Sequence, residues 1–319
     1  MSVHSPGRTC PVSYRYSPRV FDREPEIRAE VLYVVGGLYG NVEALAALAE
    51  LAARERSRAA IVFNGDFHWF DVASADFDAV ANFVARHHAT RGNVETEIAG
   101  EESGAGCGCV YPLDVSDAEV ARSNEILARL RGTARRFPVE RLRLACLPMH
   151  RVARVGRCRV AIVHGDACSL AGWGFAHGRL DDPGHGRWIE AMFREARVDV
   201  FASSHTCLPA LRRFGADGAD TVVANNGAAG MPNFRGTRHG VVTRIARAPF
   251  AGRQALCGVE VAGVHVEAIA LEYDHARWRE RFLAAWPEGS SAHAAYFRRI
   301  AEGPPFELAS AMPRALAAM

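Results

Sequence analysis

Four polar side chains that could hold a metal ion each follow an apolar run of the sequence. They are Asp66, Asn93, His164 and His205, and each lies in a short phrase with small or polar neighbours: Gly-Asp, Gly-Asn, His-Gly and Ser-His-Thr. Together they offer one carboxylate, one amide oxygen and two imidazoles, a mixed oxygen and nitrogen set that suits Zn, Mn or Fe(II). Taken singly each phrase is weak, because Gly-Asp is usually a turn. The signal comes from all four in this order.

The elements that must position these side chains alternate along the chain. Short apolar, β-branched runs predict buried strands, and capped amphipathic stretches predict helices between them. We expect strands at 30–35, 59–63, 198–202, 221–224, 239–246 and 257–271, a hairpin at 142–163, and helices from Asn41, at 75–87, 116–131 and 187–196, with a helical tail after Asp274. Residues 99–114 are glycine-rich and read as a loop. This alternation predicts an α/β fold with its active site in polar loops at the strand ends.

Because these short motifs follow the expected strands in this order, the sequence resembles the calcineurin-like metallophosphoesterases over residues 30–247. That family shows Asp-x-His, Gly-Asp, Gly-Asn, His and His-x-His in this order. The matching stretches are VLYVVGGLYGNVEAL, VFNGDFHWF, RGNVE, VAIVHGD and SSHTCLPAL. The resemblance implies two packed mixed β-sheets flanked by helices, a four-layer α/β/β/α sandwich. It also implies a two-metal centre that hydrolyses phosphate esters, with one metal held by Asp66, Asn93, His164 and His205. Asp66 would bridge to the second metal.

The ligands that belong to the second metal alone do not match the family pattern. Gly37 stands where the family has the first Asp, Tyr39 where it has the first His, and Cys207 where it has the last His. Val94 also replaces a His that many members carry. Two divalent ions about 3.5–4 Å apart repel each other by roughly 15–20 kcal/mol at an effective dielectric constant of about 20. With one carboxylate missing, a normal pair of divalent ions is poorly supported.

Three alternatives follow from these substitutions. The enzyme could use one ion and its activated water. Tyr39 and Cys207 could themselves bind a second metal as phenolate and thiolate, which would favour a different ion such as Fe(III). The chain could also be a non-catalytic relative that keeps the fold and one metal site. The expected cofactor is therefore a divalent transition metal, Mn, Zn or Fe, with one or two ions per chain.

Other residues near these phrases are weaker candidates for a role. Arg91 directly precedes the Gly-Asn phrase, where an Arg in part of the family grips phosphate through paired hydrogen bonds. His68 and Asp71 could assist the site, although a polar loop pair is the plainer interpretation. Asp166 could hydrogen-bond a ligand imidazole. Cys107 and Cys109 could form a redox or metal pair, but incidental cysteines in a glycine-rich loop are the plainer interpretation.

Bulk properties limit the classes of function. The 319 residues carry a net charge of only +2 and are 49% hydrophobic, so we expect a large buried core and no dedicated nucleic-acid surface. The eight cysteines are expected to be reduced thiols. With neither a signal sequence nor a membrane span recognised, the chain is expected to be cytoplasmic. We expect an N-terminal extension (1–29), a metallophosphoesterase-like domain (30–273) and a helical C-terminal segment packed on it (274–319). The expected partner is a small phosphorylated substrate; the sequence leaves its identity and the oligomeric state open.

Overall fold

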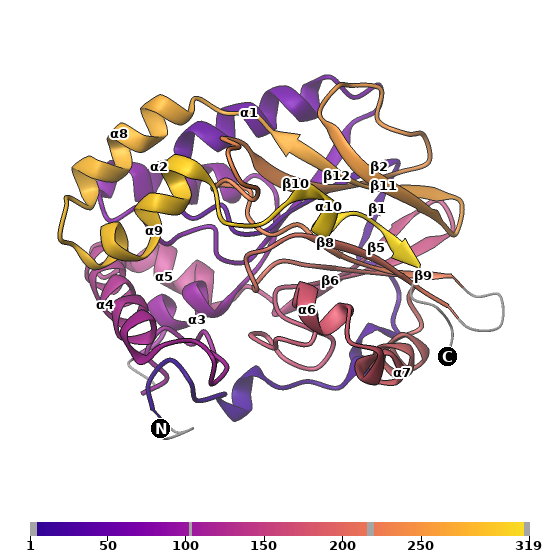
Figure 1. The fold of residues 1–319 in the computed structure, drawn as a ribbon, viewed down its shortest axis with the longest axis horizontal. Coiled ribbons are helices and arrows are strands. Elements are labelled where there is room, and N and C mark those ends of the chain that lie inside the picture. The colour runs from indigo at the N-terminus through magenta and orange to yellow at the C-terminus, as the bar shows by residue number, and fades with distance from the viewer. Residues whose placement is uncertain (1–4, 102–103, 216–219, 316–319) are drawn as a thin grey trace.

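Two β-sheets pack face to face in the computed structural model, which describes residues 5–101, 104–215 and 220–315 (Figure 1). The remaining residues include ends of the predicted N-terminal extension, glycine-rich loop and C-terminal segment, and they lie outside the described part. The first sheet has the order β1 (Ile27–Ala29), β5 (His150–Val155), β6 (Cys158–Val163), β7 (Val200–Ser203), β9 (Thr221–Asn225), β8 (Ala210–Phe214) and β13 (Arg314–Ala315). The second has the order β11 (Ala255–Val261), β12 (Val264–Leu271), β10 (Gly240–Ala246), β2 (Val31–Val35), β3 (Ala59–Asn64) and β4 (His88–Thr90).

Both sheets are mixed, and each contains three neighbouring strands that run parallel. In the second sheet β2, β3 and β4 run parallel, while β10 pairs with β2 in the opposite direction. In the first sheet β6, β7 and β9 run parallel, whereas β5 is antiparallel to β6 and β8 is antiparallel to β9. The inner faces meet in one apolar layer in which Leu32 and Val34 pack with Val160, Ile162 and other buried side chains. This arrangement confirms the predicted sandwich of two mixed sheets.

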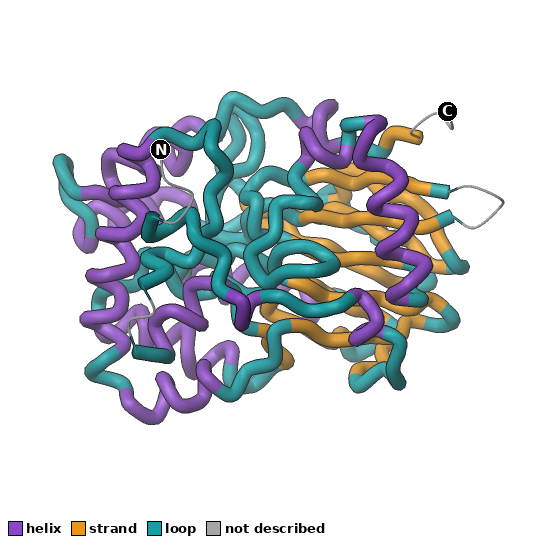
Figure 2. Tube along the Cα trace, turned by 90° about the horizontal axis from the view of Figure 1, so that it is seen from below, coloured by secondary structure: helices purple, strands orange, loops and turns teal. Residues whose placement is uncertain are grey.

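Helices cover the outer face of each sheet. The α-helices are α1 (Val42–Ala53), α2 (Ser74–Val84), α3 (Asn93–Ala99), α4 (Asp117–Ala134), α5 (Pro138–Ala145), α6 (His177–Leu180), α7 (Gly186–Ala196), α8 (His275–Ala285), α9 (Ser291–Glu302) and α10 (Leu308–Ala311), and short 3-10 turns lie at Val12–Tyr14, Pro18–Phe21 and Pro183–His185. Leu45 and Leu48 of α1 pack beneath Tyr33 of β2, whereas Ile189 and Phe193 of α7 pack on Phe201 of β7. Seen from below, loops and helical segments cross in front of the strands (Figure 2).

Two of the predicted helices begin at residues whose side chains cap the helix N-terminus. The Asn41 side chain accepts hydrogen bonds from the backbone N–H groups of Glu43 and Ala44, and α1 begins at the next residue. Ser116 and Glu119 form a reciprocal capping box at the start of α4. Each device satisfies backbone donors that an open helix end would leave unpaired.

Two predictions about local structure were wrong. Residues 142–145 were expected to begin a hairpin, but they end helix α5, because Pro138 at the first helical position favours a helix start and Leu144 is buried. The hairpin begins later, at His150. Residues 27–29 were expected to be irregular, yet they pair in parallel with β5 and bury Ile27 in the layer between the sheets.

The described helices do not include a membrane span. None of them is both long enough and apolar enough to cross a bilayer. The cytoplasmic location stays a prediction from the sequence.

Candidate metal centre

The four candidate ligands meet at the carboxyl ends of strands from both sheets. Asp66 follows β3 and Asn93 follows β4 as the first residue of α3. His164 follows β6 and His205 follows β7 in the other sheet. Because the two sheets pack face to face, their parallel strands bring all four side chains to one edge of the sandwich, where α/β proteins place their sites.

Three of the ligand atoms surround one nitrogen of the fourth side chain. The Nε2 atom of His164 lies 3.0 Å from Oδ1 of Asn93, 3.1 Å from Nδ1 of His205 and 3.3 Å from Oδ1 of Asp66. Ligand atoms about 2.1 Å from a tetrahedral zinc ion lie about 3.4 Å from one another. The separations therefore match those of donors around a single ion, although the structure contains none.

Neighbouring carbonyl groups determine which atoms face inward. The other ring nitrogen of His164, Nδ1, lies 2.9 Å from the carbonyl oxygen of Asn64, and Nε2 of His205 lies 3.0 Å from that of Cys109. The Nδ2 amide of Asn93 donates to the carbonyl of Cys107. Each outer nitrogen must carry the proton, so the inward atoms of neutral imidazoles are lone pairs. Four acceptors that face one another require a cation, and metal-binding His residues are typically held in this way.

Burial and charge act on the imidazoles in opposite directions. Burial, followed by the adjacent His164, lowers the pKa of His205 to about 3, which keeps its lone pair available. Burial also lowers the pKa of His164, but the carboxylate of Asp66 outweighs it, and the net shift is upward. A proton on His164 would satisfy only some of these contacts, whereas a divalent cation satisfies all four acceptors.

Glu95 holds the loop that carries Asp66, a role that the sequence analysis missed. Its buried carboxylate accepts hydrogen bonds from the backbone N–H groups of Asp66, Phe67, His68 and Gly92, at 2.8–3.2 Å. Asp66 has a left-handed backbone (φ 50°), which costs energy for a residue with a side chain. The four hydrogen bonds offset that cost. The available signal was the capping-box spacing, with Glu three residues after Gly92.

Gly37, Tyr39 and Cys207, the three residues that depart from the family's second-metal ligands, contact one another. The Tyr39 hydroxyl lies 2.9 Å from the Cys207 sulfur, whose thiol lies within hydrogen-bonding distance of the His205 carbonyl. A Cβ atom added at Gly37 would lie only 2.9–3.1 Å from the ring and hydroxyl of Tyr39. The three departures from the family pattern are therefore one packing unit, in which the Tyr39 ring covers the bare backbone of Gly37.

Burial affects both members of this pair in the same direction. It is the main cause that raises the pKa of Tyr39 well above its ordinary value, and Cys207 and Asp66 raise it further. Burial also raises the pKa of Cys207, although Arg299 acts against it. Without a metal ion beside them, both side chains are therefore neutral and hydrogen-bond each other.

The packing of Tyr39 on Gly37 predicts how much a side chain at position 37 lowers the free energy of unfolding. Gly37→Ala is expected to lower the free energy of unfolding by about 2–4 kcal/mol, from left-handed backbone strain (φ +63°) plus crowding against the ring. Gly289→Ala is the control, since it has a similar φ of +86° but open space around its Cβ, and should cost about 1–2 kcal/mol. Urea unfolding measures both. Equal losses in the two variants, or no coupling between Gly37→Ala and Tyr39→Ala in a double-mutant cycle, would contradict the packing account.

The other predicted residues lie apart from the four ligands or serve the loops around them. Nη1 of Arg91 donates to the carbonyl of Ala145, and its buried Nε has no hydrogen-bond partner among the described residues. His68 and Asp71 form a buried pair, with Nδ1 and Oδ2 2.5 Å apart. His68 also stacks on Phe77.

Asp166 was proposed as a partner for a ligand imidazole, but its carboxylate binds a loop instead. It accepts hydrogen bonds from the backbone N–H groups of Cys168, Ser169 and Gly174. The two candidate ligand imidazoles are oriented by backbone carbonyls instead, His164 by that of Asn64 and His205 by that of Cys109.

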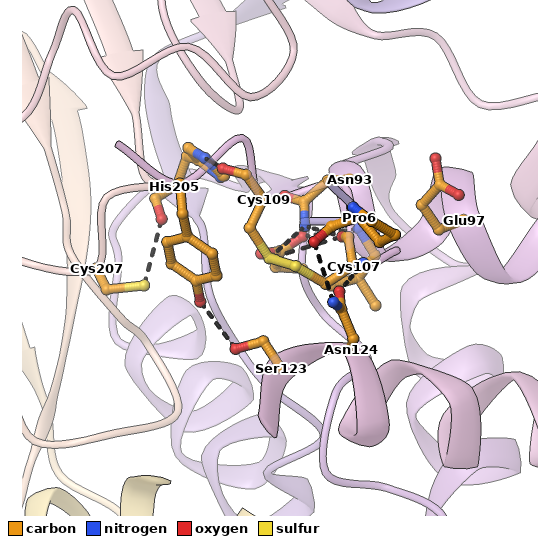
Figure 3. The surroundings of a disulfide bond; sticks show 12 residues. Pro6, Asn93, Glu97, Cys107, Cys109, Ser123, Asn124, His205 and Cys207 are labelled. Atoms are coloured by element: carbon orange, nitrogen blue, oxygen red, sulfur yellow. Dashed lines mark hydrogen bonds between the residues drawn. A yellow bond between two sulfur atoms is a disulfide. The ribbon is translucent and has the colours of Figure 1, made fainter. Parts of the chain in front are cut away.

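The expectation that all eight cysteines are reduced was wrong for one pair. Cys107 and Cys109 form a disulfide in the glycine-rich loop, with their Cα atoms 5.4 Å apart, within the normal range for such bonds. Figure 3 shows this disulfide beside Asn93 and His205. The remaining six cysteines are free.

Comparison with solved structures identifies the fold. No protein-family model matches the sequence, and no curated protein matches it. A metallophosphoesterase from Sphaerobacter thermophilus superposes with a TM-score of 0.53 and 17% identity, over 86% of this chain and 100% of that one. The chain has the metallophosphoesterase fold. A second similar structure with this fold is hypothetical protein PH1004 from Pyrococcus horikoshii OT3 (TM-score 0.56, 18% identity, 86% of this chain and 99% of that one).

Proposed function

We propose that the chain hydrolyses phosphate mono- or diesters with the help of one divalent transition-metal ion, Zn, Mn or Fe(II). The observation that carries the proposal is the convergence of Asp66, Asn93 and His205 on Nε2 of His164 within 3.3 Å. The metallophosphoesterase fold supports the same reaction class. A phosphorylated small molecule is the proposed substrate.

Each residue of the centre has a defined part in this proposal. Asp66, Asn93, His164 and His205 hold the ion, and the carbonyls of Asn64 and Cys109 fix the imidazole orientations. A bound divalent ion supplies an activated water, whose pKa it lowers toward about 7, and polarises the phosphoryl oxygen. Arg91 is the candidate for gripping the phosphate, since its Nε–H has no partner.

A single ion fits this chain better than two. A second ion would need the space and ligands of the family's first Asp, its first His and its last His. Gly37 offers no side chain, and the Tyr39 ring lies over it with its hydroxyl on Cys207. Ligation by Tyr39 and Cys207 would require both to lose their protons and their mutual hydrogen bond.

One observation favours a second candidate, a non-catalytic relative that binds a metal without turnover. The four ligands are at most 6% exposed, and four protein donors already complete a tetrahedral set. Catalytic zinc sites usually keep one position open, whereas structural sites are closed. The hydrolase proposal therefore requires the cover over the site to move or the ion to take a fifth ligand.

A substrate screen separates the two candidates. The protein is loaded with Zn, Mn or Fe(II) and assayed with p-nitrophenyl phosphate and bis(p-nitrophenyl) phosphate. The hydrolase proposal predicts turnover with at least one ion, which a chelator abolishes and re-addition of that ion restores. Metal-dependent thermal stabilisation without turnover under any of these conditions would instead support the non-catalytic candidate.

A further inference from the structure

A short loop closed by a disulfide forms part of the cover over the metal centre. We call residues 105–111, which include Cys107 and Cys109, the roof loop. Backbone carbonyls of its two cysteines accept hydrogen bonds from two of the candidate ligands: Asn93 Nδ2 donates to Cys107 at 2.9 Å, and His205 Nε2 donates to Cys109 at 3.0 Å. Trp173 Nε1 also donates to the Cys109 carbonyl. The disulfide-bonded residues therefore lie one hydrogen bond away from two of the candidate metal ligands.

We propose that the Cys107–Cys109 pair is a redox-modification site that controls metal retention and access at the centre. The proposal rests on the metal site proposed above and extends it to regulation. In the oxidised chain the three-residue ring fixes the two carbonyls that orient Asn93 and His205. Reduction releases them.

The chemical step is thiol–disulfide exchange with a dithiol. A thiolate of the dithiol attacks one sulfur of the pair, the S–S bond breaks, and a mixed disulfide forms. The second thiol of the reagent resolves it. Two electrons and two protons pass to Cys107 and Cys109, and the dithiol leaves as a disulfide. Cys109 is 7% exposed and Cys107 is fully buried, so Cys109 is the sulfur to be attacked.

Tight packing on the far side of the roof loop directs any movement toward the ligands. The backbone N–H of Gly7 donates to Ala105, that of Tyr111 donates to Gly7, and that of Cys107 donates to the Asn124 side chain. These contacts clamp the loop to the N-terminal segment and to α4. When the sulfurs separate from bonding distance, about 2 Å, to a non-bonded contact, these hydrogen bonds oppose movement of the loop toward the N-terminal segment and α4.

The backbone at the glycine between the two cysteines packs closely against its neighbours. A Cβ atom at Gly108 would strike the Tyr14 hydroxyl and would lie 3.2 Å from the Cβ of Asn93. The backbone of the three-residue ring thus lies directly against a ligand side chain. Displacement of the sulfurs is expected to shift the carbonyls of Cys107 and Cys109, and hence Asn93 and His205.

The experiment compares zinc release from the oxidised and the reduced protein. Thiol counting first establishes the state, with six free thiols expected for the oxidised chain and eight for the reduced one. The protein is reduced with dithiothreitol, freed of reagent without air, and loaded with one equivalent of Zn(II). Transfer of zinc to a chromogenic chelator then gives the rate. We expect release at least about tenfold faster from the reduced chain, since loss of outer partners of metal ligands typically costs 10–100-fold.

Two variants distinguish the effect of reducing the roof-loop disulfide from effects of the other cysteines. The double variant Cys107→Ser/Cys109→Ser should release zinc rapidly with or without reductant. Cys146→Ser, which removes an exposed free thiol at the end of α5, should keep the redox response of the native chain. If the double variant does not fold, the comparison of native oxidised and reduced protein still decides the matter.

Each remaining outcome has one meaning. Equal release rates in the two verified redox states would overturn the roof-loop proposal while leaving the metal site in place. Eight free thiols in air-oxidised protein would also overturn it. Failure of either redox state to bind zinc would instead remove the metal site on which the proposal rests.

Discussion

Replacement of His164 by alanine is expected to abolish metal retention and hydrolysis together. His164 Nε2 lies within 3.3 Å of the other three donors, so its loss removes a ligand and leaves a gap at the centre of the set. Mutation of a residue that only hydrogen-bonds a metal ligand typically lowers metal affinity 10–100-fold. Loss of a ligand itself should therefore lower the affinity by at least about 100-fold. Zinc at 100 times the dissociation constant should stabilise the native protein by about 3 kcal/mol and the variant by almost nothing.

The control for this variant is His265→Ala, in β12. His265 pairs with an exposed carboxylate, Glu260, on the second sheet and takes no part in the metal centre. Its zinc-dependent stabilisation, measured by thermal unfolding with and without zinc, should match that of the native protein. Retention of one tightly bound zinc ion by His164→Ala would show that the ion is held elsewhere.

Glu95→Gln is expected to cause a large loss of stability although it leaves the four candidate ligands in place. The carboxylate accepts four backbone N–H groups, two on each oxygen, whereas an amide offers only one oxygen and turns an NH2 group toward donors. Two charge-assisted hydrogen bonds are lost and buried donors are left unpaired. The expected cost is about 3–5 kcal/mol, and zinc affinity should fall about 10–100-fold as the Asp66 loop loosens.

Glu119→Gln is the matched control, because Glu119 occupies the same capping position at the start of α4 but is exposed. Its cost should stay below about 1 kcal/mol. Urea unfolding of the metal-free proteins gives both values. Similar small losses in the free energy of unfolding of the two variants would mean that Glu95 only caps a helix and does not hold the Asp66 loop.

The strand ends were predictable because the signal is local. Apolar β-branched runs predicted β2, β3 and β7, and in parallel strands of one sheet the residues that follow the strands lie at the same edge. The sequence therefore predicted that Asp66, Asn93, His164 and His205 lie at strand ends, and the structure adds that the first two follow strands of one sheet and the last two follow strands of the other. The order of the phrases predicted the sandwich that the structural comparisons confirm.

What the sequence could not show depends on contacts between distant segments. Glu95 acts on backbone groups 27–29 residues earlier in the chain, and no local pattern reveals that. Gly37, Tyr39 and Cys207 were recognised as departures, but only the folded chain shows that the Tyr39 ring covers Gly37. The partners of Cys107 and Cys109 likewise lie in other elements, Asn93 at the start of α3 and His205 after β7.

The central claim, one metal ion held by four donors, is tested most directly by elemental analysis. The chain is purified without added metal, and bound metals per protomer are measured with an absorption spectrum alongside. We expect about one Zn, Mn or Fe per chain, lost in His164→Ala, with no intense visible band. About two ions per chain, or a coloured iron species that depends on Tyr39, would contradict it and show that Tyr39 and Cys207 build a second site.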